Sequence, residues 1–281
     1  MNALKKIEEI TKIFEKNQIP FPQKEAQEIV CHIAKIDKVK LYSQNPQLTS
    51  RQIYEIYQLV QRRLKREPLQ YIIGECDFFN IKLKVGPGVL IPRPETEILV
   101  EEFLKREEIK NKKNGLVVDL CTGSGCIALS IAKNLPQLKI IGVDISENAI
   151  KYAQKNKILN SVSNAFFVVG NLLSPLKKNS FISITANPPY VKSDEIINLQ
   201  PEIRDFEPKE ALDGGQKGLL YYEKILKNAE DYLIEEGLIF FEIGIRQSEE
   251  IKKMAEKLRF KVIKIVPDLA GIERVMILKR S

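Results

Sequence analysis

Hydrophobic residues in the first 75 positions recur at steps of three and four, the spacing of one face of an α-helix. The clearest series are Ile7, Ile10 and Phe14; Ala26, Ile29, Val30 and Ile33; and Ile53, Ile56, Leu59, Val60 and Leu64. Breaks that contain proline separate the series, and Thr49 or Ser50 can cap the last helix. The pattern predicts a small helical bundle over residues 1–75.

The spacing changes after the bundle. Phe79, Ile81, Leu83 and Val85 alternate with polar residues, which is typical of a strand with one buried face. Gly86-Pro87-Gly88 then predicts a turn, and residues 89–91 predict a returning strand. We therefore expect residues 76–92 to form a β-hairpin that links two domains.

Residues 93–281 alternate short hydrophobic runs with segments long enough for a helix. Seven runs predict strands, at 115–120, 140–144, 166–169, 181–185, 238–242, 260–265 and 274–278. A short connection that contains glycine joins the last two, which predicts antiparallel pairing. The expected fold class is α/β: a Rossmann-like, doubly wound sheet of about seven strands with an antiparallel last strand, plus the small helical bundle.

Composition narrows the possible chemistry. The 281 residues are 44% hydrophobic, which is enough for a sizeable core. The chain includes one histidine, so catalysis by an imidazole base is not expected. The four cysteines lack paired C-x-x-C spacing, and we expect no metal site. No hydrophobic run approaches membrane-spanning length, and we expect a soluble, cytoplasmic protein.

The net charge of +7 is distributed unevenly along the chain. Residues 1–75 contain 13 Lys and Arg against 9 Asp and Glu, a difference of +4, and Arg62, Arg63, Lys65 and Arg66 lie together. The cluster is either a solvated helix face or a docking surface for an acidic or nucleic-acid-bearing partner. Charge alone leaves both interpretations open.

A glycine loop follows the first strand of the second domain. The sequence from Gly123 to Ala128 matches G-x-G-x-x-A, and Asp144 ends the next strand about twenty residues later. This combination predicts a nucleoside site, in which Asp144 accepts hydrogen bonds from ribose hydroxyls. NAD is one possible ligand. Asp119, just before the loop, favours a cationic cofactor such as S-adenosylmethionine, although it could instead brace the loop by hydrogen bonds.

The fourth strand of the sheet runs into Asn187-Pro188-Pro189-Tyr190. Two consecutive prolines can neither donate to a sheet nor enter a helix, so this loop is stiff and extended. It presents a side-chain amide, backbone carbonyls and an aromatic ring at the carboxyl end of a strand, where α/β sheets bind ligands. A planar group with N–H donors would find fixed acceptors here.

Together these motifs resemble a class I S-adenosylmethionine-dependent methyltransferase that modifies a planar nitrogen. More closely, Leu90-Ile-Pro-Arg-Pro-Glu-Thr-Glu97, Arg204-Asp-Phe-Glu-Pro208 and Phe241-Glu-Ile-Gly244 resemble the peptide chain release factor glutamine N5-methyltransferases. The resemblance implies methylation of the glutamine in the Gly-Gly-Gln motif of class I release factors. It also implies that residues 1–75 dock the substrate protein and that residues 93–281 form the methyltransferase domain.

The resemblance further implies the roles of particular residues. The cofactor-binding set is Asp119, Cys121, Thr122, Gly123, Ser124, Gly125, Asp144, Asn171, Leu172 and Asn187. Asn171 and Leu172 occupy the adenine side, where the family often has an acidic residue followed by an aromatic one. The substrate-binding set is Asn187, Pro188, Pro189 and Tyr190, of which Asn187, Pro188 and Tyr190 are expected to act in catalysis.

The expected mechanism relies on positioning. The side-chain carbonyl of Asn187 and the backbone carbonyl of Pro188 accept the two hydrogens of the substrate amide, and Tyr190 packs against its flat face. Both hydrogen bonds strengthen as the nitrogen gains positive charge. The proton then leaves without a catalytic base, because an alkylated, protonated amide is very acidic.

Other functions use the same motifs. Methylation of a ribosomal-protein glutamine or of adenine N6 in nucleic acid would use the same Asn-Pro-Pro-Tyr loop, and an NAD-dependent oxidoreductase would use the glycine loop. A non-catalytic adaptor on the same fold is a further alternative. A charge of +4 over 75 residues is small for a nucleic-acid-recognition domain, so we expect no direct nucleic-acid substrate. The Pro-Glu-Thr-Glu sequence and the helical N-terminal region favour a release factor as the protein substrate. We also expect a monomer.

Overall fold

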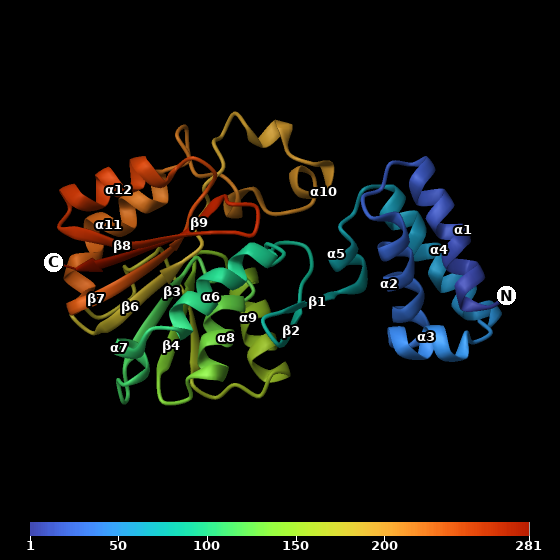
Figure 1. Ribbon diagram of the computed structural model, residues 1–281, viewed down its shortest axis with the longest axis horizontal. Helices are drawn as coiled ribbons and strands as arrows, with labels where there is room; N and C mark the ends of the chain where they lie inside the picture. Colours follow the sequence, from blue (N-terminus) through green and yellow to red (C-terminus); the bar gives the residue numbers. More distant parts are fainter. Residues whose placement is uncertain (281) are drawn as a thin grey trace. The chain divides into compact units, whose positions relative to one another are not determined.

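The computed structural model describes residues 1–280, which form two compact units. Unit 1 comprises Met1–Gly74 together with Gln200–Phe206, and unit 2 comprises Glu75–Leu199 together with the chain from Glu207 onward. Figure 1 labels most of the helices and strands of both units. The predicted fold class, a Rossmann-like sheet with a helical N-terminal region, is confirmed.

Unit 1 is a helical bundle with one hydrophobic core. Its helices are α1 (Ala3–Lys16), α2 (Pro22–Ala34), α3 (Lys38–Gln44), α4 (Ser50–Leu64), α5 (Leu69–Ile73) and the short α10 (Pro201–Arg204). The predicted hydrophobic faces meet in the core, where Ile10, Phe14 and Ile56 are fully buried. Thr49 caps α4, because its hydroxyl accepts from Gln52 N and the Gln52 side chain accepts from Thr49 N.

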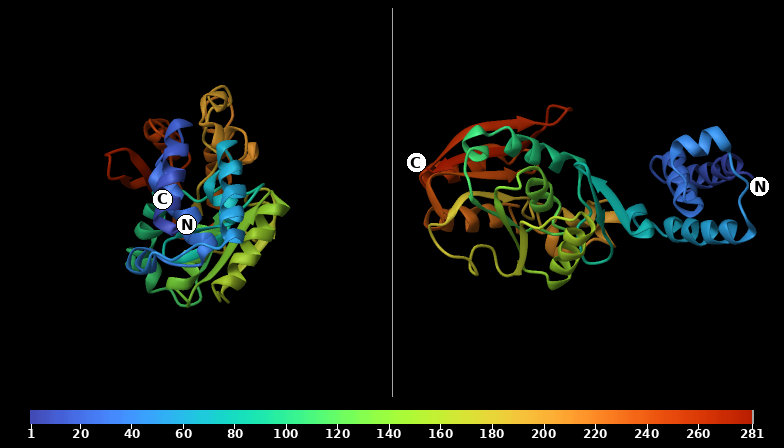
Figure 2. Two further views of the ribbon diagram at one scale, coloured as in Figure 1. Left: turned by 90° about the vertical axis from the view of Figure 1, so that its right-hand side faces the viewer. Right: turned by 90° about the horizontal axis from the view of Figure 1, so that it is seen from below.

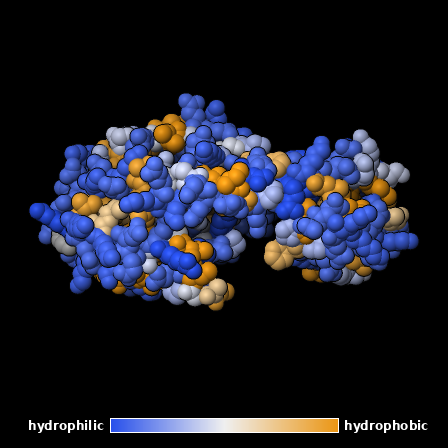
Figure 3. All heavy atoms as spheres, turned by 90° about the horizontal axis from the view of Figure 1, so that it is seen from above, coloured by the Kyte–Doolittle hydropathy of each residue, from blue (hydrophilic) through white to orange (hydrophobic). Residues whose placement is uncertain are grey.

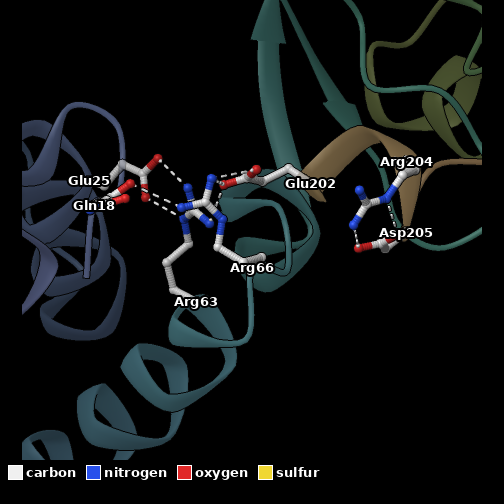
Figure 4. Close-up of polar contacts among 7 residues, drawn as sticks. All are labelled: Gln18, Glu25, Arg63, Arg66, Glu202, Arg204 and Asp205. Carbon is white, nitrogen blue, oxygen red and sulfur yellow. Dashed lines mark hydrogen bonds and ion pairs between the residues drawn. The ribbon is translucent and has the colours of Figure 1, made fainter. Parts of the chain in front are cut away.

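A buried ion pair network ties α10 to the other helices of unit 1 (Figure 4). Arg63, at the end of α4, is only 2% exposed and lies between two carboxylates. Its Nε is 2.6 Å from Glu25 Oε2 on α2, and its Nη1 is 2.9 Å from Glu202 Oε1 on α10. Arg66 is 3.0 Å from the same Glu202 and also donates to the carbonyl of Gln18. A buried guanidinium needs such partners, so this network holds residues 200–206 in unit 1.

The basic cluster of unit 1 is therefore engaged mainly with carboxylates of the chain itself. Arg62 pairs with Glu67, and Arg63 and Arg66 pair with Glu202. Of the four cations, Arg63 is buried, whereas Arg62 and Lys65 are exposed, so only part of the cluster is a solvated face. The docking role of residues 1–75 and the boundaries at 75 and 92 remain predictions, and the structure adds a short segment from much later in the chain to the bundle.

Unit 2 contains a seven-stranded sheet (Figures 1 and 2). Its strands are β3 (Leu116–Leu120), β4 (Lys139–Asp144), β5 (Ala165–Val169), β6 (Phe181–Ala186), β7 (Leu233–Glu242), β8 (Phe260–Pro267) and β9 (Glu273–Arg280). The order is β5-β4-β3-β6-β7-β9-β8, and β9 pairs antiparallel with both β7 and β8. The other neighbours are parallel, so β3, β4, β5, β6 and β7 end at one edge of the sheet.

Helices cover both faces of this sheet. The helices of unit 2 are α6 (Glu97–Leu104), α7 (Glu107–Lys110), α8 (Cys126–Asn134), α9 (Glu147–Leu159), α11 (Leu220–Tyr232) and α12 (Ser248–Lys257). Neighbouring strand residues point to opposite faces, as Phe240 packs with α6 and α8 while Phe241 packs with α11 and α12. Burial on both faces explains why the central strands β3 and β6 read as continuous hydrophobic runs. The edge strands β5 and β8 are partly exposed.

The predicted hairpin exists, and Gly86-Pro87-Gly88 does turn the chain, since Val89 N donates to Gly86 O at 3.3 Å. That turn is not the turn of the hairpin, however, which lies earlier in the chain than predicted. Its strands are β1 (Glu75–Phe78) and β2 (Ile81–Lys84), and Phe78 pairs with Ile81. The turn is Phe79-Asn80, with φ of 40° and 60°, and residues 89–91 are not a strand. Asparagine tolerates positive φ in such two-residue turns, and Phe79 N donates to Glu97 Oε1 at 3.0 Å, which holds the turn against α6.

The surface agrees with burial of the hydrophobic faces. On the side drawn in Figure 3, hydrophilic residues dominate and hydrophobic residues form small, separate patches. Within residues 1–280, no helix combines the length and apolar character needed to cross a bilayer.

The network around Arg63 makes a testable prediction about stability. Arg63→Met leaves Glu25 and Glu202 without their shared cation, and we expect a loss of about 3 kcal/mol in the free energy of unfolding. Burial already raises the pKa of Glu25, and the removal of Arg63 raises it further. Urea unfolding followed by circular dichroism measures the loss, and hydrogen-exchange mass spectrometry assigns it to unit 1. Arg51→Met, on an exposed pair of the same helix, serves as the control and should leave stability unchanged.

Candidate active site

A cavity of about 570 Å³ opens in unit 2 at the edge of the sheet where the parallel strands end. Its size lies within the range of small-molecule sites. Residues that follow four neighbouring strands line it: Cys121, Thr122, Gly123 and Ser124 after β3, Asp144 at the end of β4, Gly170, Asn171 and Leu172 after β5, and Asn187 and Pro189 after β6. Most of the predicted site residues therefore meet around one space.

The glycine loop between β3 and α8 combines three residues with positive φ. They are Cys121, Gly123 and Gly125, at 56°, 55° and 81°. A Cβ on Gly123 would meet nothing nearer than a carbonyl at 4.0 Å, so a ligand can approach this backbone closely. A Cβ on Gly125 would lie 3.0 Å from the ring of Phe167 and 3.1 Å from Ala153 Cβ. Gly125 does not line the cavity, and the packing of α8 is what requires it.

Asp144 is held by two backbone N–H groups. Its Oδ2 accepts from Gly123 N at 2.8 Å, and its Oδ1 accepts from Ser146 N at 2.9 Å. Burial raises the pKa of Asp144, and these N–H groups partly offset that effect. Each carboxylate oxygen has a second lone pair, so Asp144 can still accept hydrogen bonds from a ligand in the cavity.

Asp119 is fully buried and does not line the cavity. Thr122 Oγ1 donates to its Oδ2 at 2.5 Å, and Thr185 Oγ1 donates to its Oδ1 at 2.8 Å. Burial raises the pKa of Asp119 to about 7, against the lowering effect of these hydroxyls. The carboxylate thus fastens the start of the glycine loop to β6. This geometry favours the bracing role over direct contact with a cofactor.

Asn187 follows β6 and is partly buried at the cavity wall. Its Nδ2 donates to Thr96 Oγ1 at 3.3 Å, and Thr96 Oγ1 donates to Glu242 Oε2 at 2.6 Å. Pro189 also lines the cavity, whereas Pro188 is buried and does not. The predicted acceptor role of the Pro188 carbonyl remains a prediction.

Tyr190 packs on the core beside α11 and does not line the cavity. A Cβ on Gly244 would lie 3.0 Å from Tyr190 Cδ2, and the Tyr190 carbonyl accepts from Gln247 Nε2 at 3.0 Å. Burial raises the pKa of the phenol to about 12, so it stays protonated at physiological pH. Its predicted contact with the substrate amide also remains a prediction.

Two segments that form the rim of the cavity are tied together by one carboxylate. Glu207 Oε1 is 2.5 Å from Arg93 Nη2, and Glu207 Oε2 accepts from Ile91 N at 3.1 Å. Burial raises the pKa of Glu207, which Arg93 and the Ile91 N–H partly offset. Arg93 and Pro208 both line the cavity, so this ion pair fixes the spacing of the two rim segments.

Comparison with known proteins identifies the family. One family model, described as PrmC N-terminal domain, matches residues 6–74, and another, described as Methyltransferase small domain, matches residues 94–203. A release factor glutamine methyltransferase from Thermodesulfovibrio yellowstonii is 56% identical over 281 residues, covering 100% of this chain and 99% of the relative. The chain belongs to the release factor glutamine methyltransferase family.

Other relatives agree with this assignment. Release factor glutamine methyltransferases from Fusobacterium nucleatum subsp. nucleatum and Geobacter sulfurreducens are 38% and 40% identical, over 95% and 86% of this chain and 75% and 84% of theirs. A crystal structure of a methyltransferase from Pyrococcus furiosus has a TM-score of 0.56 at 19% identity, covering 83% of this chain and 100% of that one. At this identity the likeness shows the fold alone.

Sequence reasoning missed Thr96, which lines the cavity, and Glu242, which accepts a hydrogen bond from it. It also missed other polar residues that line the cavity: Ser146, Asn148, Glu210, Tyr221 and Lys224. Glu242 ends β7, and Ala186 of β6 pairs with Phe241 of β7, so Asn187 and Glu242 come next in register. The strand-end rule that identified Asp144 could have identified Glu242 as well. Thr96 lies in the Pro-Glu-Thr-Glu motif, but nothing in the sequence indicates its contact with residues far along the chain.

The buried Asp119 predicts an unusual dependence of stability on pH. Its pKa is about 7 in the folded protein, above the 3.8 of an exposed aspartate, so the folded state binds more protons between these pH values. The contribution of Asp119 to the free energy of unfolding is therefore fully present below pH 4. It is lost as the pH rises to 7, by roughly 1 kcal/mol per pH unit between these values.

Asp119→Asn should flatten that dependence, because asparagine does not titrate. Urea unfolding between pH 5 and 8 measures the pH dependence of the free energy of unfolding in the wild type and in the variant. Glu242, whose pKa burial also raises to about 7, still titrates in the variant and leaves a smaller slope. An equal slope in both proteins would contradict the assignment of this proton to Asp119.

Proposed function

We propose that this enzyme transfers the methyl group of S-adenosyl-L-methionine to the side-chain amide nitrogen, N5, of the glutamine in the Gly-Gly-Gln motif of class I release factors. Family membership at 56% identity over the whole chain supports the reaction class. The observation that carries the proposal at the level of the site is the placement of Asn187 on the same cavity wall as the glycine loop and Asp144.

The cavity residues fit the proposed cofactor. Gly123 offers a backbone face without a side chain, and Asp144 retains acceptor capacity for the two hydroxyls of a ribose. Cys121 to Ser124 would hold the methionine part, and Asn171 and Leu172 the adenine. S-adenosyl-L-methionine, when bound, supplies an electrophilic methyl carbon on a sulfonium.

The role of the protein is to position the nucleophile. An amide nitrogen is a poor nucleophile because its lone pair is delocalised into the carbonyl. Asn187 Oδ1 accepts one N–H of the substrate amide and holds the nitrogen in line for attack. This hydrogen bond strengthens as the nitrogen becomes positive, so it stabilises the transition state more than the ground state. The amide then loses its proton to water.

A transfer experiment tests the function. The enzyme is incubated with labelled S-adenosyl-L-methionine and a purified class I release factor, and the methylated residue is mapped by mass spectrometry. We expect a single methyl group on the glutamine of Gly-Gly-Gln, and none on a release factor with alanine in its place. Preferred methylation of a ribosomal protein or of adenine in DNA would overturn the proposed substrate.

Asn187→Ala tests the catalytic role. We expect kcat to fall on the order of 100-fold, because one transition-state acceptor is lost, while the affinity for S-adenosyl-L-methionine is largely kept. Steady-state kinetics with release factor and calorimetry with cofactor separate the two effects. A folded variant that transfers methyl groups at the wild-type rate would exclude this mechanism.

Asp144→Asn tests the cofactor site. Replacement of the carboxylate weakens its hydrogen bonds to the ribose, and we expect the Kd for S-adenosyl-L-methionine to rise roughly tenfold or more. Glu147→Gln removes the same charge from an exposed position nearby and should leave the Kd unchanged. Titration with NADH should show no binding; tight NADH binding would favour the oxidoreductase alternative.

A further inference from the structure

The hydroxyl of Thr96 lies between Asn187 and a carboxylate buried in the sheet. Thr96 is 1% exposed and Glu242 is 2% exposed. Thr96 Oγ1 is 2.6 Å from Glu242 Oε2 and 3.3 Å from Asn187 Nδ2. The three side chains come from the turn before α6, the end of β7 and the end of β6, which lie far apart in the sequence.

We infer that Thr96 and Glu242 are positioning residues that hold the Asn187 amide with its carbonyl oxygen toward the substrate. The inference rests on the proposed function and adds two residues to it. Neither residue reacts; each acts through Asn187.

The direction of the hydrogen bonds follows from what each group can donate. An ionised carboxylate only accepts, so the single proton of the Thr96 hydroxyl is used on Glu242. The Thr96 oxygen then has only lone pairs to offer Asn187, and Asn187 must present its NH2 group to it. The Asn187 carbonyl is left for the cavity, which is the orientation that accepts an N–H of the substrate amide.

Several groups act on the charge of the buried Glu242. Burial raises its pKa, and Glu95 raises it further, whereas the Thr96 hydroxyl, Arg274 and Arg93 favour the charged form. Burial, and after it the charge of Glu242, raises the pKa of the Tyr190 phenol, and the Tyr222 hydroxyl donates to the Glu242 backbone carbonyl at 2.9 Å. A protonated Glu242 becomes a donor to Thr96, whose hydroxyl can then donate to the Asn187 carbonyl and turn the amide. Protonation of Glu242 should therefore slow methyl transfer.

Thr96→Val and Thr96→Ser form a matched pair for the test. Valine keeps the shape of threonine but has no hydroxyl, whereas serine keeps the hydroxyl. We expect Thr96→Val to lower kcat roughly tenfold or more, with the KM for S-adenosyl-L-methionine unchanged, and Thr96→Ser to stay near the wild-type rate. Ser183→Ala removes a buried hydroxyl that donates to Leu238 O, away from the cavity, and serves as the control with normal kcat.

Glu242→Gln adds a readout that packing alone would not move. Burial raises the pKa of Glu242 to about 7, so kcat of the wild type should fall as pH decreases through about 7. Glu242→Gln should lower kcat at pH 8 and abolish this acid limb, because glutamine does not titrate. An unchanged acid limb would overturn the role of Glu242.

The remaining outcomes separate this inference from the proposed function. If the wild type methylates the release factor and Thr96→Val is folded and equally active, the positioning role is wrong. It is also wrong if Thr96→Ser is as impaired as Thr96→Val. If the wild type methylates no glutamine, the proposed function is wrong. A measurement that needs no substrate then tests whether Thr96 holds the Asn187 amide by a hydrogen bond.

That measurement is hydrogen exchange of the Asn187 side-chain amide by NMR. The resonance is assigned by its absence in Asn187→Asp. We expect protection from exchange in the wild type at pH 8 and faster exchange in Thr96→Val. Equal exchange in both proteins would overturn the inference whatever the substrate is.

Discussion

A carboxylate that is removed from water must find hydrogen-bond donors, and this requirement organises the edge of the sheet where the cavity lies. Asp119 accepts hydrogen bonds from the hydroxyls of Thr122 and Thr185, and Glu242 accepts one from the hydroxyl of Thr96. Unpaired, each charge would cost several kcal/mol. With its hydrogen bonds formed, each carboxylate joins elements that are distant in the sequence. One carboxylate fixes the loop that faces the proposed cofactor, and the other fixes the residue that faces the proposed substrate.

The parallel register brings these two fixed points together. Because β3, β4, β6 and β7 end at one edge, the polar residues at their ends lie close together. The order and direction of the strands are enough to bring them there. The rim segments are then spaced by the Glu207–Arg93 pair. The interior of the sheet provides rigidity, and the chemistry needs only a few side chains at its border.

The parts of this arrangement that depend on local pattern can be predicted from the sequence. The glycine loop, Asp144 and Asn187 were predicted because each directly follows a recognisable hydrophobic run. Contacts between distant segments have no local pattern in the sequence. The hydrogen bonds from Thr96 to Glu242 and from Thr185 to Asp119 could therefore be identified only from the structure. The hairpin shows a different limit. Gly86-Pro87-Gly88 has the composition of a turn, yet the ladder closes at Phe79-Asn80, since pairing of Phe78 with Ile81 decided the register.

The membership of Glu202 in the bundle has a consequence for how the protein is made. Helices α1 to α5 leave the ribosome well before residue 202 has been added to the chain. During that interval Arg63 has only one of its two carboxylates, and the bundle is incomplete. Arg63 therefore obtains its second carboxylate only after β3, β4, β5 and β6 have been synthesised. Unit 1 is discontinuous in the sequence, because four strands of the sheet in unit 2 precede its last segment.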